Sequence, residues 1–167
     1  MKYFEDFYTL MNETAKRNGF SLHTKKYYEG IFKSFSTSKE LENSYLAIAY
    51  FKEKILAIDL VIVHGKIANY VFGASNNEER NRMPAHSAQW TAIKYAKSLG
   101  CDLYNFGGVS LEGKKHVYKG WEGLTSFKQK FGGYAVSHLV FFDYVALPLW
   151  YYAYNLRKYL KRFLPFI

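Results

Sequence analysis

The sequence has few of the residues and motifs that support disulfides, metal sites or nucleotide cofactors. A single cysteine, Cys101, excludes an internal disulfide framework and a cysteine-based zinc site. The five histidines are scattered, with no HxxxH or HxH pair, so we expect no metal site. No Walker motif, GxGxxG fingerprint or GxSxG elbow occurs, although a Ser-His-Asp triad assembled from distant residues stays open.

The chain also lacks an uncharged run long enough to cross a bilayer. The nearest candidate, residues 144–155, is far shorter than the roughly 20 residues that a spanning helix needs. The start of the chain does not read as a signal peptide, because Glu5 and Asp6 interrupt any apolar stretch. We therefore expect a cytoplasmic protein, peripheral at the inner face of the membrane if residues 144–167 contact lipid.

The composition favours one globular domain over residues 1–167. Apolar residues make up 49% of the chain, which excludes a disordered protein. The 16 tyrosines and 14 phenylalanines suit either a tyrosine-rich core or a cleft that is apolar yet wet. A net charge of +9 favours partners that carry phosphate, such as nucleic acid, nucleotide-sugars or anionic lipid.

Hydrophobic periodicity and turn residues predict an α+β fold. Three strands joined by tight turns at residues 53–54 and 65–66 predict an antiparallel meander. The order of elements is that of the GNAT acyltransferase fold, a mixed, mostly antiparallel sheet flanked by helices, here with a C-terminal helix. The expected helices cover residues 1–18, 25–36, 84–100 and 124–131, and Gly132 and Gly133 end the last of them. The expected strands cover residues 45–51, 55–64, 67–73, 102–106 and 134–142. We expect the C-terminal helix to begin at Asp143 and to be bent or restarted at Pro148.

Residues 104–133 are the stretch around which we expect a site. They read as a strand, a Gly-Gly turn, a basic loop and a helix whose apolar face lies close to Lys128. Loops between strand and helix often carry sites in α/β proteins. A lysine there either neutralises charge in acyl transfer, binds a phosphate, or is a plain surface residue. The expected substrate-binding residues of this stretch are Tyr104, Asn105, Gly107, Gly108, Lys114 and Lys115.

Two other segments leave alternatives open. GNAT enzymes bind coenzyme A with a glycine-containing loop, whereas residues 80–86 contain no glycine, and Pro84 lacks an amide donor; this argues against acetyl-CoA. Arg80 and Arg82 either bind another phosphate or belong to a solvated loop. The aromatic and basic residues of 144–167 suit an anionic membrane, a phosphate backbone, or packing on the core with a solvated basic face.

Several motifs occur in a characteristic order along the chain. The pattern Tyr-Asn-Phe-Gly-Gly (104–108) is followed by Gly-Leu-x-x-Phe-Lys-x-x-Phe-Gly-Gly (123–133). Earlier come Glu-Thr-Ala-Lys-Arg-Asn-Gly-Phe (13–20), Lys-Lys-Tyr-Tyr (25–28) and Tyr-x-Phe-Gly-Ala-Ser (70–75). Together these motifs resemble the Fem family of peptidoglycan-bridge aminoacyltransferases, in which the first of the three reads Glu-Thr-x-x-Arg-Asp-Gly-Phe, and the match covers most of the chain. Family members have two GNAT-like halves, and this chain resembles the second.

The resemblance implies transfer of an amino acid from aminoacyl-tRNA to the stem peptide of a UDP- or lipid-linked peptidoglycan precursor, without a cofactor. It assigns Phe127 and Lys128 to the reacting ester, and Arg17 to the precursor's phosphates. The basic loop and the C-terminal helix would meet tRNA. The chain would act alone, pair with a copy of itself or with a separately encoded first half, or be a fragment or an inactive remnant that only binds. The alternatives are a GNAT-like transferase with another acyl donor, and a non-catalytic module that binds RNA or membrane.

Overall fold

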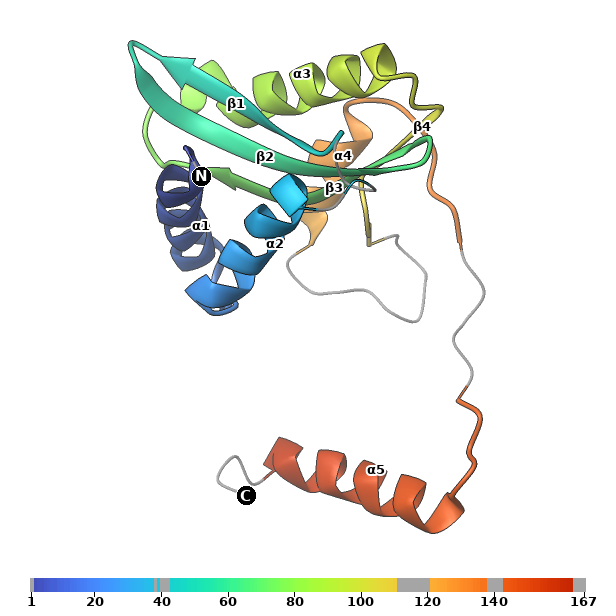
Figure 1. Cartoon of the computed structure of the whole chain (residues 1–167). Helices are drawn as coiled ribbons and strands as arrows, with labels where there is room; N and C mark the ends of the chain where they lie inside the picture. Colours follow the sequence, from blue (N-terminus) through green and yellow to red (C-terminus); the bar gives the residue numbers. More distant parts are fainter. Residues whose placement is uncertain (1, 38, 40–42, 111–120, 138–142, 164–167) are drawn as a thin grey trace. The chain divides into compact units, whose positions relative to one another are not determined.

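The computed structural model describes residues 2–37, 39, 43–110, 121–137 and 143–163 (Figure 1). The chain divides into two units, Met1–Gly133 and Tyr134–Ile167, each of which is described by itself. Expected elements at residues 111–120 and 138–142, with Lys114 and Lys115 of the basic loop, lie outside the described residues.

The first unit is built on a four-stranded sheet in the order β1-β2-β3-β4. The predicted meander is confirmed: β1 (Tyr45–Phe51), β2 (Lys54–His64) and β3 (Ile67–Ser75) pair antiparallel. The first turn lies one residue earlier than predicted, at Lys52 and Glu53. Both have positive φ, 46° and 65°, as a two-residue hairpin turn of the mirror-image type requires.

Helices cover both faces of this sheet (Figure 1). On one face, α1 (Phe4–Asn18) and α2 (Lys25–Thr37) pack with Ile58 and Leu60 of β2 around Phe7. On the other face, α3 (Pro84–Ser98) packs Ala92 and Ala96 against Val61. Because β2 is central and covered on both sides, it reads as a nearly continuous apolar run, which Asp59 interrupts.

The fourth strand and the helix after it end earlier than predicted. β4 (Leu103–Asn105) pairs parallel to β3 and is shorter than the expected 102–106. α4 (Glu122–Gln129) is followed by a turn at residues 130–131. Gly132 and Gly133, with positive φ values of 78° and 88°, therefore lie beyond the helix end.

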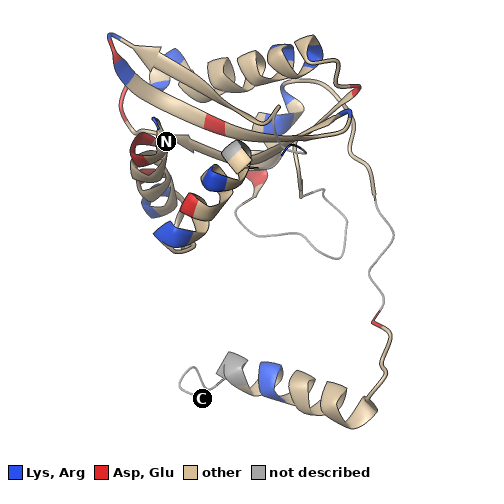
Figure 2. Ribbon diagram, viewed as in Figure 1, with Lys and Arg blue, Asp and Glu red and all other residues tan. Residues whose placement is uncertain are grey.

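The second unit contains α5 (Pro148–Phe163). The prediction that this helix begins at Asp143 is wrong: residues 143–147 precede it, and Pro148 opens it, since a first helical residue needs no N–H donor. The predicted strand at 134–142 is also wrong where it is described, because residues 134–137 form no strand. α5 carries basic and no acidic residues (Figure 2). No helix in the described part of the chain is long and apolar enough to cross a membrane.

Candidate active site

The candidate site lies where β3 and β4 part. The two parallel strands pair at three positions, the last joining Asn69 to Asn105, after which β3 continues to Ser75 without β4. The Asn105 amide donates to Asn69 Oδ1 at 3.1 Å, and Asn105 Oδ1 accepts from the Gly107 N–H at 2.9 Å. Asn105 therefore starts the turn by which the chain leaves the sheet.

The two glycines of this turn are required for different reasons. Gly107 has φ 72°, a conformation that residues with a Cβ rarely adopt. A Cβ on Gly108 would lie 3.2 Å from Cζ3 of Trp121, which is tighter than ordinary packing. A Cβ on Gly107 would lie 3.9 Å from Nζ of Lys128 and 3.8 Å from the Tyr70 carbonyl oxygen. The turn thus brings the backbone close to both Lys128 and Tyr70.

Lys128 is the central side chain of the site. It is only 7% exposed, and its ammonium donates to the Gly108 carbonyl at 2.6 Å. Burial lowers the pKa of Lys128 below its usual value, because the charged form loses water. One helical turn earlier, Thr125 Oγ1 accepts from the Ser110 N–H at 2.9 Å. α4 therefore holds the loop at two points, and Lys128 is one of them.

Phe127 belongs to an aromatic cluster that joins α4 to the start of α3. Its ring centroid lies 4.8 Å from that of His86 and 5.3 Å from that of Phe131, which also contacts Phe106 at 5.6 Å. Burial lowers the pKa of His86, whose Nε2 has no hydrogen-bond partner among the described residues. Sequence reasoning did not single out His86, since isolated histidines carry little signal.

Tyr104, predicted to bind substrate, lies in a polar cluster under α3. Its hydroxyl accepts from Gln89 Nε2 at 2.6 Å, and burial raises its pKa, helped by the charge of Asp59. Burial also raises the pKa of Asp59 well above its usual range. Neither Asp59 nor Gln89 was predicted from the sequence to be a site residue. The available signal was one carboxylate within the apolar strand of residues 55–64.

Arg17 makes contacts that hold the fold together. Its guanidinium donates to the Ser75 carbonyl at 2.9 Å, to Ser75 Oγ at 3.1 Å and to Asn77 Oδ1 at 2.7 Å. Ser75 lies five residues along β3 from Tyr70, about 16 Å at the usual strand rise. The structure thus places Arg17 at the far end of β3 from Lys128, so it does not bring these two predicted site residues together.

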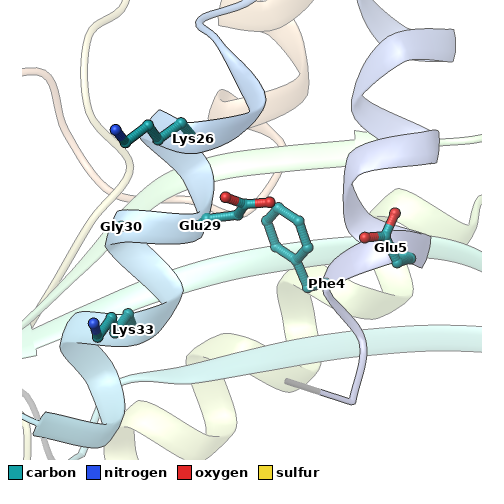
Figure 3. Close-up of a pocket in the computed structure, with 6 residues that line it drawn as sticks. All are labelled: Phe4, Glu5, Lys26, Glu29, Gly30 and Lys33. Carbon is teal, nitrogen blue, oxygen red and sulfur yellow. The ribbon is translucent and has the colours of Figure 1, made fainter.

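A hollow lies between α1 and α2 (Figure 3). It has a volume of about 590 Å³, and its lining mixes acidic and basic side chains around Phe4. No predicted site residue lines it. Among the described residues there is no group of His, Cys, Asp and Glu side chains that fits a metal ion.

The sheet whose strands β3 and β4 part, flanked by helices on both faces, has the GNAT-like fold. An aminoglycoside acetyltransferase from an uncultured soil metagenomic sample shares this fold, with a TM-score of 0.57, 12% identity, and coverage of 84% of this chain and 88% of that one. The model of the FemAB family matches residues 37–159, and the chain belongs to that family. Both the fold class and the family expected from the sequence are confirmed.

The relatives within the family are longer than this chain. Lipid II:glycine glycyltransferase of Staphylococcus aureus (strain USA300) is 37% identical over 86 residues, which are 52% of this chain and 20% of that protein. The protein of the same name from Staphylococcus saprophyticus is 35% identical over 104 residues, 62% of this chain and 25% of that protein. The structure of FemX, at 21% identity and a TM-score of 0.67, covers 80% of this chain and 48% of its own length. This chain therefore matches a fifth to a quarter of the curated relatives' length and about half of FemX.

Proposed function

We propose that this chain carries the acyl-transfer site of an aminoacyltransferase that builds peptidoglycan cross-bridges, with aminoacyl-tRNA as donor and the stem peptide of a UDP- or lipid-linked precursor as acceptor. The observation that carries the proposal is the buried ammonium of Lys128 beside the Gly107-Gly108 turn, where β3 and β4 part. Membership of the FemAB family, and relatives named as lipid II:glycine glycyltransferases, support it.

In the proposed mechanism the acceptor amine attacks the ester carbonyl of the donor. The new amide C–N bond forms, the ester C–O bond breaks, and the ribose hydroxyl leaves with the proton that the amine gives up. Negative charge develops on the carbonyl oxygen and then on the ribose oxygen. A preorganised cation in a site with little water stabilises such charge strongly, and Lys128 would supply that cation. Binding of both substrates supplies the orientation.

A transferase with acetyl-CoA as donor is the less favoured alternative, although GNAT acetyltransferases share the fold. The loop between β3 and α3 offers few amides to a pyrophosphate. Pro84 has none, and the N–H groups of His86 and Ser87 both donate to the Met83 carbonyl, at 3.0 and 3.3 Å. These two N–H groups therefore already have a partner at the start of α3.

The precursor site is proposed to need more protein than this chain supplies. The chain spans about half of FemX, so a second GNAT-like half, wherever it is encoded, would complete the site. A half of this kind would bind tRNA without transferring its amino acid.

The test is transfer of a radiolabelled amino acid from charged tRNA to UDP-linked and lipid-linked precursor. Lys128→Ala should slow product formation by about 100-fold or more, while Lys130→Ala, which removes an exposed lysine two residues on, should not. Product formed by Lys128→Ala at the wild-type rate would overturn the proposed role. Salt-sensitive tRNA binding without product would indicate a half-enzyme. If the chain gave no product and did not bind tRNA, the proposed function would be overturned.

A further inference from the structure

Two buried side chains under α3 have polar atoms that nothing in the described part of the chain satisfies. Asp59, in the middle of β2, is 3% exposed, and its Oδ2 has no hydrogen-bond partner there. Gln89 of α3 is fully buried, and its Oε1 is equally unpartnered. Burying such groups without partners costs free energy, so an unsatisfied pair needs an explanation.

Two tyrosines complete the group, and a glycine makes room for one of them. A Cβ on Gly73 would lie 1.9 Å from the Tyr70 hydroxyl and 2.7 Å from Asp59 Oδ1, so both oxygens lie close to the same point above Gly73. The Tyr104 hydroxyl accepts a hydrogen bond from the side-chain amide of Gln89. We call Asp59, Tyr70, Gln89 and Tyr104 the acceptor cluster.

The unsatisfied atoms of this cluster are acceptors. The oxygens of a carboxyl group and an amide have lone pairs to offer, and within the described residues no ion pair joins Asp59 to a basic side chain. A ligand that satisfies both must donate hydrogen bonds, and one that also offsets a carboxylate must be a cation. A primary ammonium has three N–H donors and one positive charge.

We propose that the acceptor cluster binds the α-ammonium group of the donor amino acid. This inference rests on the proposed function, and it adds a residue that selects for a free amine on the donor. Tyr70 links the two places: its carbonyl oxygen faces Gly107 beside Lys128, and its hydroxyl lies against Gly73 and Asp59. In this arrangement the donor would present its ester to Lys128 and its ammonium to Asp59.

The charge balance of the cluster agrees with this role. Burial raises the pKa of Asp59, so in the empty site the carboxyl group tends to hold its proton. An arriving ammonium favours the carboxylate, and Asp59 then releases that proton. Tyr70 and Tyr104 are partly exposed, whereas Asp59 and Gln89 are buried.

The test measures binding of glycinamide, which carries an ammonium, and of N-acetylglycinamide, which is neutral, to the whole chain. Changes in the Gln89 side-chain amide resonance give a dissociation constant for each. Glycinamide should bind at least about tenfold more tightly than the acetylated compound, and Asp59→Asn should remove that preference. Asp102→Asn, which neutralises an exposed carboxylate at the start of β4, is the matched control and should leave both constants unchanged.

Equal binding of the two compounds, or glycinamide binding that survives Asp59→Asn, would overturn the inference. So would a Gln89 resonance that neither compound moves, since the cluster would then hold ordered water only. The amide spectrum of Asp59→Asn shows whether the variant is folded. The assay uses neither tRNA nor precursor, so it separates the two proposals. Asp59-dependent glycinamide binding by a chain that neither transfers an amino acid nor binds tRNA would support the ammonium pocket and overturn the proposed function. Transfer that accepts an N-acetylated donor would do the reverse.

Discussion

At the scale of single residues, the site depends on Lys128, whose side chain is buried away from water. Lys128 has one hydrogen bond among the described residues, to the Gly108 carbonyl, so the ammonium still has donors for a substrate. Because the lowered pKa reflects burial, the charge is easier to remove than that of a surface lysine.

The pH dependence of transfer follows from that shift. If the ammonium is required, the rate should fall as pH rises through a value below the usual 10.5 of lysine. Lys128→Arg keeps its charge to higher pH, so its alkaline limb should move upward, with a lower plateau because the guanidinium has a different shape. Lys128→Ala should lose about 100- to 1,000-fold in rate. Initial rates across the alkaline range, corrected for ester hydrolysis, are the measurement. Superimposable alkaline limbs for wild type and Lys128→Arg would contradict the assignment.

Asp59 should make the folded state less stable as pH rises. Its folded pKa is raised by burial above the usual 3.8, so between these two values the folded chain binds more protons than the unfolded chain. The stabilising contribution is complete below the unfolded pKa and is lost as pH rises through the folded pKa. Asp59→Asn should therefore be more stable than wild type at pH 7, and this difference should shrink toward pH 4. Urea unfolding at both pH values measures it, with Asp102→Asn as the exposed control. A variant that is less stable at pH 7 would refute the expectation.

Some residues could be assigned from sequence and others could not. Phe127 and Lys128 stand in a motif whose apolar residues recur at helical spacing, so the helix that carries them was predictable. The partners of Arg17 are backbone and side-chain oxygens 58 to 60 residues away, and no local pattern reveals such contacts. Asp59 sits in a strand that otherwise reads as buried core, and only the packed structure shows its oxygen to be unsatisfied.

At the scale of elements, Arg17 joins α1 to the end of β3. Thr14 supports the same joint, donating to the Ser75 carbonyl at 3.1 Å and accepting from the Ser75 N–H at 3.0 Å. A lysine at position 17 lacks the planar fork that reaches several acceptors at once.

Arg17→Lys should lower the free energy of unfolding by about 1–3 kcal/mol, because hydrogen bonds to the end of β3 are lost. Lys16→Ala, one residue away and exposed, should have little effect. Chemical denaturation gives both values, and precursor affinity is measured on the same samples. If Arg17 instead binds precursor phosphates, as the resemblance implies, affinity would fall while stability stays unchanged.

Periodicity placed most of the elements correctly, and the misses have physical causes. The meander and α3 have strong patterns with turns at their ends. The turn at residues 52–53 was predicted one residue too late, because lysine and glutamate rarely adopt the positive φ that they have here and so do not indicate a turn of this type. Residues 134–137 alternate like a strand, yet a strand forms only where another edge accepts its hydrogen bonds, which sequence alone does not show.

α5 presents two faces that suit a lipid surface. Leu149, Leu156 and Leu160 recur at helical spacing and are exposed, while Arg157 and Lys158 lie off that stripe. The chain should therefore bind vesicles that contain anionic phosphatidylglycerol more tightly than vesicles of phosphatidylcholine alone. Leu156→Ser should weaken this binding about tenfold or more, whereas Asn155→Ser, on the other face, should not. Cosedimentation measures both. Equal binding to the two vesicle types would contradict a membrane role.

At the scale of the whole molecule, sequence could predict the fold and family but not the assembly. The order of elements and the spaced motifs identified a GNAT-like half, because both are local or periodic properties. How such a half completes a precursor site depends on contacts with protein that this chain does not contain, and about half of FemX has no counterpart here.

The net charge of +9 makes tRNA binding the most accessible whole-molecule property to test. Each phosphate that a basic side chain neutralises releases counterions, so affinity should fall as a power of the salt concentration. If about four phosphates are engaged, the slope of log K against log salt should be about −3 to −4. UDP-linked precursor, with two phosphates, should show a shallower slope in the same titration. Lys128→Ala should lower the slope by about one at most, because it removes a single positive charge, and that charge is buried and proposed to act at the ester. A tRNA affinity that does not change with salt would show that the charge of the chain serves another partner, and would remove the donor from the proposed reaction.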